Sequence, residues 1–585
     1  MSTISGGAAV PDGPGSATGG AAAMTRARPL WWIAGILPFL TAFLVTARVR
    51  LNGDVDYALG TMETAGRGGV GVGEVFAARP YAYRLFMDVL DRGRRLISDA
   101  PGSTLTDDVI IRCETVAFVV LVGVVLYAGL RRRLPGAPAG VISLVVTGSL
   151  AIAPPWHFLE PDWVGVLFAV LGVGTCLLPR NVWLGAVAGG IPLLITVAMK
   201  TATFPWALIA LIAIGVLSRR RAIYTAIAWL LLVVAWLIVT RYVQHWEWRW
   251  LQDQAKLVHT SPIHNGIRLE DLKLLLQAAA NVVIVSPILV AYPVAAAVLV
   301  QRRTGRARWV TLAVLVVVAG LCLASGYGQG EFFMYHFAGM PVVGAAVWAV
   351  AVARPSAARL PLVVAPVLGA IASAVLMAQP LAWRRDHLWW AIGIELLIAA
   401  AATGWALIAM RRRVPSTDRP WWVPAIGVAA AAALVTPLLP RSTYSFDLFD
   451  DSVVVGPNIA SIRAADRQYD ALRARIGADT RVTYFTYGAY NRALGNPTTC
   501  RYPSPQWLQR SVRLSSVRNY PSYIDNLRCL TSDGGAKYLV WEPSWFSLKG
   551  AAPQIREYAA KFDCSKSGRV PAPRALVVCP RKPLP

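Results

Sequence analysis

The chain has 585 residues, of which 56% are hydrophobic and 15% are charged, and its formal net charge is +25. A soluble globular protein has about 25% charged residues, so this composition excludes an ordinary soluble protein. The positive charge does not indicate a nucleic-acid partner, because many of the arginines lie in short loops between apolar runs, where the topology of a membrane protein requires them.

Long apolar runs begin after a short N-terminal segment and continue to residue 439. Residues 1–29 are dominated by Gly, Ala, Ser and Pro without periodicity, so we expect a disordered cytoplasmic tail there. Each later run is long enough to cross a bilayer when tilt and local thinning are allowed. The runs lie at 30–47, 111–130, 139–156, 163–178, 183–199, 203–217, 222–240, 279–300, 309–325, 338–353, 360–378, 389–410 and 421–439. The sequence therefore predicts an α-helical polytopic membrane protein with about thirteen transmembrane helices, in a domain of residues 30–439.

Arginine clusters give these predicted spans a direction. The clusters fall on alternate loops, at 131–133, 219–221, 302–308, 354–359 and 411–413. Because cytoplasmic loops are enriched in Lys and Arg, we expect these loops and the N-terminus on the cytoplasmic side of the plasma membrane. The first outer loop is then 48–110, and an odd number of spans places residues 440–585 outside as well.

The segment 440–585 is polar enough to form a separate domain outside the membrane. An amphipathic helix pattern at 459–476 is followed by short strand patterns at 482–485, 538–541 and 575–578. Helical stretches lie between these strands, which predicts a small extracytoplasmic α/β domain.

Four cysteines lie in this C-terminal segment. Three connectivities are possible for four cysteines, and an exported domain favours disulfides over free thiols. Proximity along the chain favours the pairs Cys500–Cys529 and Cys564–Cys579.

The first outer loop carries two candidate catalytic carboxylates, Asp54 and Asp56, a few residues past the first span. A carboxylate there can take a proton from an acceptor hydroxyl as that hydroxyl attacks a sugar carbon. The alternative is that the two aspartates cap a following helix at 57–64, a role that Asp56 fits well.

The second outer loop carries Glu160 and Asp162 on either side of Pro161. Two outward-facing carboxylates could bind a divalent cation, steer an acceptor or polarise a hydroxyl. The alternative is a simple turn, in which Pro161 breaks one helix and Asp162 caps the next.

Lys200 and His336 are the other ionisable groups that the predicted topology does not explain. Lys200 lies at the outer end of a span, against the usual charge bias, and is a candidate for binding a lipid phosphate. The alternative is that its side chain extends to the interface without a specific partner. A belt of interfacial aromatic residues accounts for Tyr335 but not for His336, which could contact a phosphate or the acceptor.

The order and sidedness of these motifs resemble the GT-C superfamily of integral membrane glycosyltransferases, and within it the bacterial arabinosyl- and mannosyl-transferase-like branch. The resemblance covers nearly the whole chain in architecture: many spans, a large acidic first outer loop and an outer C-terminal domain. It implies a GT-C-like fold and a polyprenyl-phosphate-linked sugar as donor.

The resemblance also implies roles for particular residues. A base in the first loop matches Asp54, and an acidic site in the second loop matches Glu160 and Asp162. Basic groups near the donor phosphate match Lys200, Arg79 and Arg84. The chain departs from the usual pattern by having two aspartates in the first loop.

We therefore expect an inverting glycosyltransferase that moves a sugar to an envelope glycan, lipid or protein acceptor at the outer face, with membrane lipids around it. No cofactor is predicted, apart from a possible divalent cation at Glu160 and Asp162. Two other functions remain as alternatives. A flippase or transporter of lipid-linked sugars would need polar residues within the spans, and few are present. A non-catalytic envelope assembly protein would not need the acidic loops.

Overall fold

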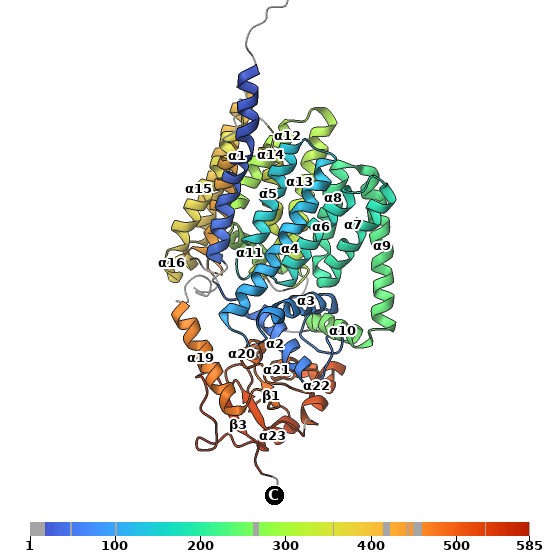
Figure 1. Ribbon diagram of the computed structural model, residues 1–585, viewed down its shortest axis with the longest axis vertical. Coiled ribbons are helices and arrows are strands. Elements are labelled where there is room, and N and C mark those ends of the chain that lie inside the picture. Colours follow the sequence, from blue (N-terminus) through green and yellow to red (C-terminus); the bar gives the residue numbers. More distant parts are fainter. Residues whose placement is uncertain are drawn as a thin grey trace, which may run out of the picture.

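The computed structural model describes residues 18–46, 49–99, 102–260, 268–330, 332–354, 356–412, 422–439, 442, 444–447, 459–532 and 534–583. A bundle of long helices forms the larger part of the molecule, and the C-terminal domain is docked on one end of it (Figure 1). Three helices lie between the two parts: α2 (Gly53–Arg67), α3 (Tyr81–Ile97) and α10 (His245–Thr260).

The bundle consists of helices rich in apolar residues. It contains α1 (Thr18–Thr46), α4 (Leu105–Arg131), α5 (Gly136–Ala151), α6 (Pro161–Leu177), α7 (Val182–Met199), α8 (Phe204–Leu217), α9 (Arg219–Tyr242), α11 (Leu272–Val285), α12 (Ala291–Gln301), α13 (Gly305–Tyr327), α14 (Gly339–Val352), α15 (Arg359–Met377), α17 (Leu388–Arg411) and α18 (Trp422–Val435). The short helix α16 (Leu381–Asp386) links α15 to α17. Within the described residues, seven helices are long and apolar enough to cross a membrane, and five further apolar helices are shorter. The chain is thus a multi-pass membrane protein, while the count of thirteen spans stays a prediction.

The span predicted at 279–300 is not one straight helix in the structure. The chain breaks at Ser286, and the helical segments Leu269–Val285 and Pro287–Gln301 differ in direction by 100°. Pro287 has no backbone N–H to donate, and it disfavours helical geometry at the residue before it, so the helix ends there.

The first helix is longer than the predicted first span. Helix α1 begins at Thr18, inside the segment 1–29 that was expected to be a disordered tail. Residues 1–17 lie outside the described residues. The boundary between tail and helix was therefore placed too late in the chain.

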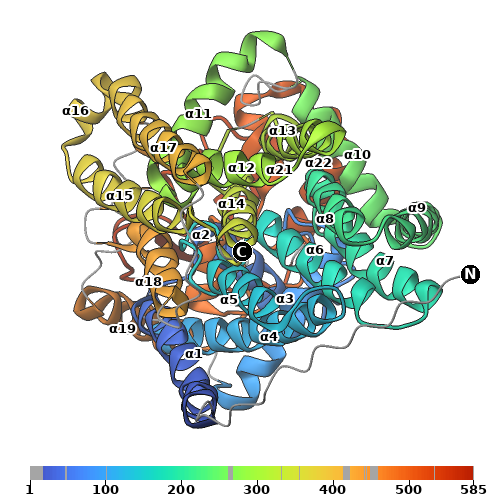
Figure 2. The same ribbon diagram turned by 90° about the horizontal axis from the view of Figure 1, so that it is seen from above.

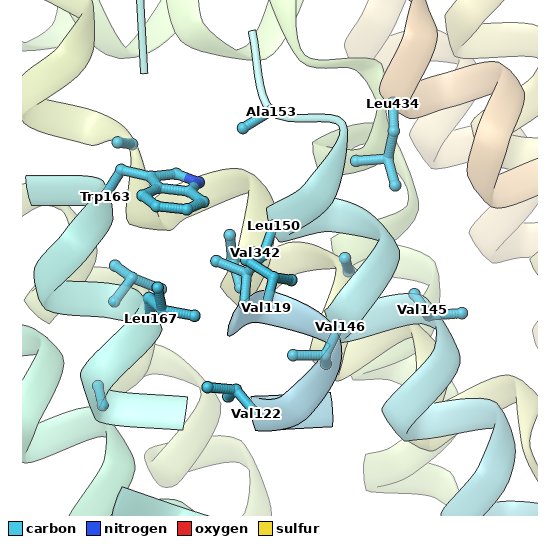
Figure 3. Close-up of a cluster of buried hydrophobic side chains, with 14 of the residues drawn as sticks. Val119, Val122, Val145, Val146, Leu150, Ala153, Trp163, Leu167, Val342 and Leu434 are labelled. Atoms are coloured by element: carbon cyan, nitrogen blue, oxygen red, sulfur yellow. The ribbon is translucent and has the colours of Figure 1, made fainter. Parts of the chain in front are cut away.

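The core of the bundle is made of packed aliphatic and aromatic side chains from neighbouring helices. Figure 3 shows Val119 and Val122 of α4 close to Val146 of α5, Leu167 of α6 and Val342 of α14. Seen from above, α5 and α14 lie near the middle of the bundle, and α1, α9 and α16 lie at its edge (Figure 2). Packing of this kind, rather than exclusion of water, holds membrane helices together.

The C-terminal domain is a small α/β unit, as predicted. Its three-stranded sheet consists of β1 (Val482–Phe485), β2 (Tyr538–Trp541) and β3 (Val577–Pro580), in the order β1-β2-β3. Strand β2 pairs parallel with β1 and antiparallel with β3. The helices of this domain are α19 (Ile459–Ile476), α20 (Gly488–Leu494), α21 (Gln506–Arg513), α22 (Pro521–Thr531) and α23 (Pro553–Ala560).

Both predicted disulfides are present in this domain. One joins Cys500 to Cys529, and the other joins Cys564 to Cys579. Cys579 lies on β3, so the second disulfide ties the edge strand of the sheet to the segment after α23.

The C-terminal domain contacts the rest of the chain chiefly where α20 packs against α2. The two helices approach so closely that a Cβ on Gly60 would lie 2.4 Å from the backbone nitrogen of Arg492. On the other side of the contact, a Cβ on Gly488 would lie 2.8 Å from the carbonyl oxygen of Tyr57. Glycines on both helices are therefore required for this docking, which brings the domain to the start of α2.

Candidate active site

A cavity of about 780 Å³ lies where the bundle, the helices α2 and α10, and the C-terminal domain meet. This volume is within the range of about 300–1,000 Å³ that is usual for small-molecule sites. Ionisable and polar residues from all three parts line it. They include Asp54, Arg79, Lys200, Gln329, His336 and Tyr487.

Asp54 reaches the cavity from the first turn of α2. Its side chain is 28% exposed, and one carboxylate oxygen lies 3.1 Å from Nη2 of Arg79. The hydroxyl of Tyr487 donates a hydrogen bond to the other oxygen. The start of a helix stabilises a carboxylate, so Asp54 is an oriented anion with access to the cavity.

Asp56, two residues further along α2, has a different environment. It forms an ion pair with Arg492 of the C-terminal domain, and Arg492 also lies 2.8 Å from Asp108. Burial raises the pKa of Asp56 to about 7, against the lowering effect of Arg492. Asp56 is not among the residues that line the cavity. Neither aspartate caps the helix, because Asn52 occupies the N-cap position.

Glu160 lies behind Arg79 and is completely buried. Its Oε2 is 3.6 Å from Nη2 of Arg79, and Nδ2 of Asn52 donates to its Oε1 at 2.7 Å. Burial, with a further contribution from the charge of Asp54, raises the pKa of Glu160 to about 8. Arg79 is therefore placed between the carboxyl groups of Asp54 and Glu160.

Asp162 and Lys200 form a second charged pair in the same region. Nζ of Lys200 lies 2.9 Å from Oδ2 of Asp162, and it also donates to the side chain of Gln329. Gln329 in turn donates to Oδ1 of Asp162 at 3.0 Å. Lys200 is 28% exposed and lines the cavity, where it lies 5.7 Å from the ring of Tyr335. It has specific partners here, unlike a lysine that only extends to the interface.

The sequence allowed two interpretations of the turn between α5 and α6: a functional acidic site, or a simple turn in which Asp162 caps the next helix. The structure has features of both. Pro161 is at the start of α6, as the turn interpretation requires, but Glu160 rather than Asp162 occupies the N-cap position. The structure shows no capping hydrogen bond from the Glu160 side chain. Both acidic side chains instead contact the cations at the cavity, so capping does not account for them.

His336 and Arg84 differ in their relation to the cavity. His336 lines it, with its ring edge-to-face against Tyr335 at 4.5 Å. Arg84 is fully buried, does not line the cavity, and lies 3.1 Å from Glu247 of α10. The structure therefore places Arg84 in support of the loop that carries Arg79 rather than in the cavity itself.

No group of three or more His, Cys, Asp or Glu side chains in the described part of the chain is arranged to hold a metal ion. The two residues considered for a cation, Glu160 and Asp162, each lie against a basic side chain.

Three residues at the site were not predicted from the sequence: Asn52, Gln329 and Tyr487. Asn52 directly precedes Gly53 and Asp54, and Gln329 lies between two glycines in an outer loop, so the positions of these two residues offered a local signal. Tyr487 is 433 residues from Asp54, and only the docking of α20 on α2 brings it there.

The fold and the cavity together define a helical multi-pass membrane protein with a docked α/β domain that completes a charged site. No protein-family model and no curated protein matches the chain. Among solved structures, it is similar to ArnT from Cupriavidus metallidurans, in the apo state and bound to undecaprenyl phosphate. For the apo structure the identity is 15% and the TM-score is 0.47, with 95% of this chain and 98% of that chain covered. For the bound structure the values are 15%, 0.47, 96% and 98%.

A second similar structure is the oligosaccharyltransferase AglB from Archaeoglobus fulgidus, in complex with an inhibitory peptide and a dolichol-phosphate. Its identity is 13% and its TM-score is 0.34, with 91% of this chain and 73% of that chain covered. Similarity at this level concerns the arrangement of the chain only.

Proposed function

We propose that this protein is an inverting membrane glycosyltransferase. In this proposal it moves a sugar from a polyprenyl-phosphate donor to a hydroxyl of an envelope glycan, lipid or protein at the outer face of the plasma membrane. One observation carries the proposal: segments far apart in sequence bring Asp54, Arg79 and Lys200 to one cavity at the end of the bundle, with Glu160 and Asp162 buried directly behind the two cations.

Asp54 is the proposed base. As an acceptor hydroxyl attacks the anomeric carbon, it becomes acidic, and a carboxylate within hydrogen-bond reach can take its proton. Asp54 fits because it is the carboxylate of the cluster that lines the cavity, whereas Glu160 and Asp162 are buried behind their cationic partners. Tyr487 and Arg79 hold its two oxygens in place, so its orientation is set before substrates bind.

Lys200 and Arg79 are the proposed partners of the donor phosphate, with His336 nearby. The bond between the sugar and the phosphate breaks in the transfer, and the phosphate leaves with an added negative charge that cations stabilise. Arg79 pairs with Asp54 and Lys200 pairs with Asp162, so carboxyl groups hold both cations at the cavity, where they can contact an incoming phosphate.

Features at the two ends of the bundle support placing the cavity at the outer face of the membrane. The cavity lies at the end where the disulfide-bonded C-terminal domain is docked, and disulfides are typical of compartments outside the cytoplasm. The arginine-bearing connections between α8 and α9 and between α12 and α13 lie at the opposite end (Figure 1). A lipid-carried donor suits this side, because nucleotide sugars remain in the cytoplasm.

The test is a transfer assay with purified protein in lipid nanodiscs, a panel of polyprenyl-phosphate sugars and an envelope acceptor fraction. We expect the unchanged protein to transfer one of the sugars and the Asp54→Asn variant to be slower by about 10²–10⁴-fold, the usual contribution of a general base. Asp88→Asn is the matched control, since Asp88 pairs with Arg92 on α3 and does not line the cavity. A chain that transfers no sugar of the panel, or an Asp54→Asn variant as fast as its control, would overturn the proposal.

A further inference from the structure

Two residues next to the site have an unusual backbone conformation. Ala78 has a φ of +54° and Leu159 a φ of +66°, and among the described residues they are the non-glycine residues with positive φ. Residues with a Cβ seldom adopt this region, because the side chain crowds the backbone. Ala78 directly precedes Arg79, and Leu159 directly precedes Glu160, so each strained residue directs one member of the site.

Both strained segments are held by adjacent residues of a single helical turn, the start of α3. The hydroxyl of Tyr83 donates to the carbonyl oxygen of Leu159 at 2.8 Å. The guanidinium of Arg84 donates to the carbonyl oxygen of Arg79 at 2.9 Å and to that of Val72 at 3.1 Å. Tyr83 and Arg84 are both completely buried, so water cannot replace these hydrogen bonds.

This helical turn is itself fixed by α10. Glu247 accepts a hydrogen bond from the backbone N–H of Tyr81 at 2.8 Å and pairs with Arg84 at 3.1 Å. The ring of Trp250, one turn further along α10, lies 5.1 Å from the Arg84 guanidinium. The first turn of α3 is therefore a rigid element, with one residue pointing to each of the two strained segments.

We propose that the first turn of α3 is a clamp in which Tyr83 and Arg84 are positioning residues. Tyr83 holds the Leu159–Glu160 segment and Arg84 holds the Ala78–Arg79 segment, so that Arg79 stays within reach of Glu160 and Asp54. Without these hydrogen bonds each segment can relax to a negative φ, which turns Arg79 and Glu160 away from one another. Neither residue touches the substrates, and the catalytic part of this inference rests on the proposed glycosyl transfer.

A pair of matched variants tests the clamp. Tyr83→Phe removes only the hydroxyl and keeps the buried ring. Tyr484→Phe is the control, because Tyr484 is equally buried and its hydroxyl donates to the carbonyl of Asn496 at 2.9 Å, away from the cavity. We expect similar small losses of thermal stability in both variants. Only Tyr83→Phe should lower kcat, by about tenfold, with the KM for the donor within twofold of the unchanged protein, because a misaligned site still binds but reacts slowly.

Arg84→Lys tests the other side of the clamp. Lysine keeps the charge that pairs with Glu247 but lacks the planar fork that donates to two carbonyls at once. We expect a lower kcat, as for Tyr83→Phe, together with a higher KM for the donor, because Arg84 holds the segment that carries Arg79, a proposed partner of the donor phosphate. A change in KM alone would show that Arg84 acts on the donor directly, and this would overturn its assignment as a positioning residue.

Hydrogen exchange of the intact protein gives a readout that does not depend on activity. The backbone N–H of Glu160 donates to the carbonyl of His157 at 3.0 Å, so peptides covering residues 155–163 should exchange slowly. Tyr83→Phe should speed their exchange at least fivefold, and Tyr484→Phe should not. Equal exchange in both variants would overturn the clamp, even if sugar transfer is confirmed. Faster exchange in a chain that transfers no sugar would support the clamp and contradict only the proposed function.

Discussion

Replacing Gly60 with alanine should separate the docking of the C-terminal domain from its folding. A Cβ at this position would lie 2.4 Å from the backbone nitrogen of Arg492 and 2.4 Å from the carbonyl oxygen of Gly488. Both atoms belong to the backbone of α20, so no side chain can move aside. An ordinary contact begins near 3.4 Å, and α20 must therefore withdraw from α2 by about 1 Å.

The consequence for the site follows from the position of Tyr487, the residue directly before α20. A shift of about 1 Å breaks the hydrogen bond from its hydroxyl to Asp54 and misaligns the proposed base. Misplacement by 1 Å can lower a rate by about 10²-fold, so we expect kcat to fall by about 10–100-fold. Overpacking of this kind also lowers the free energy of unfolding by about 1–3 kcal/mol.

Gly66→Ala is the matched control on the same helix. A Cβ at Gly66 would meet no atom within 4 Å, so alanine there should leave the docking intact. Alanine also favours a helix over glycine by about 1 kcal/mol, and the variant should be as stable as the unchanged protein or slightly more so. The assay is steady-state sugar transfer in nanodiscs, with thermal unfolding of the same samples. If Gly60→Ala kept its kcat within threefold, or if Gly66→Ala lost as much, docking would not control the site.

Three further predictions concern single groups. Tyr487→Phe removes one hydrogen bond to a charged group, worth about 1.5–3 kcal/mol, and should lower kcat by about 10–100-fold in the transfer assay; an unchanged kcat would show that Asp54 does not need this partner. Burial raises the pKa of Glu160 from 4.5 to about 8. Between these two pH values the folded protein holds a proton that the unfolded chain has released. The free energy of unfolding therefore falls progressively as the pH rises from 4.5 to 8. The gain in melting temperature on Glu160→Gln should grow over this interval and stay level above it, and a gain independent of pH would contradict the raised pKa. Alkylation of the intact protein without reductant should label none of the four cysteines at 500, 529, 564 and 579, whereas labelling of all four would contradict the disulfides.

Much of the membrane architecture could be predicted because it is encoded locally. Long apolar runs and the arginines between them determine where helices lie and on which side loops emerge. The same information placed Asp54 and Lys200 at one end of the bundle, and the structure brings both to a single cavity. The disulfides could be paired because Cys500 and Cys529, and then Cys564 and Cys579, are neighbours along the chain.

Long-range contacts account for most of what the sequence did not show. The difference between Asp54 and Asp56 depends on Arg492, which is 436 residues from Asp56, and no local pattern reveals that partner. The family resemblance implied that Arg84 binds the donor phosphate, but in the structure Arg84 pairs with Glu247 of α10 and does not line the cavity. The break at Ser286 had a local signal in Pro287, which the apolar character of the segment hid.

The most direct test of the central claim is a single-turnover measurement with a bound polyprenyl-phosphate sugar that the protein accepts. The account predicts that the Asp54→Asn variant binds this donor with the same Kd as the unchanged protein but transfers its sugar at least a hundredfold more slowly. Equal single-turnover rates for the two proteins would show that Asp54 does not take the proton of the acceptor, and the proposed mechanism would have to be abandoned.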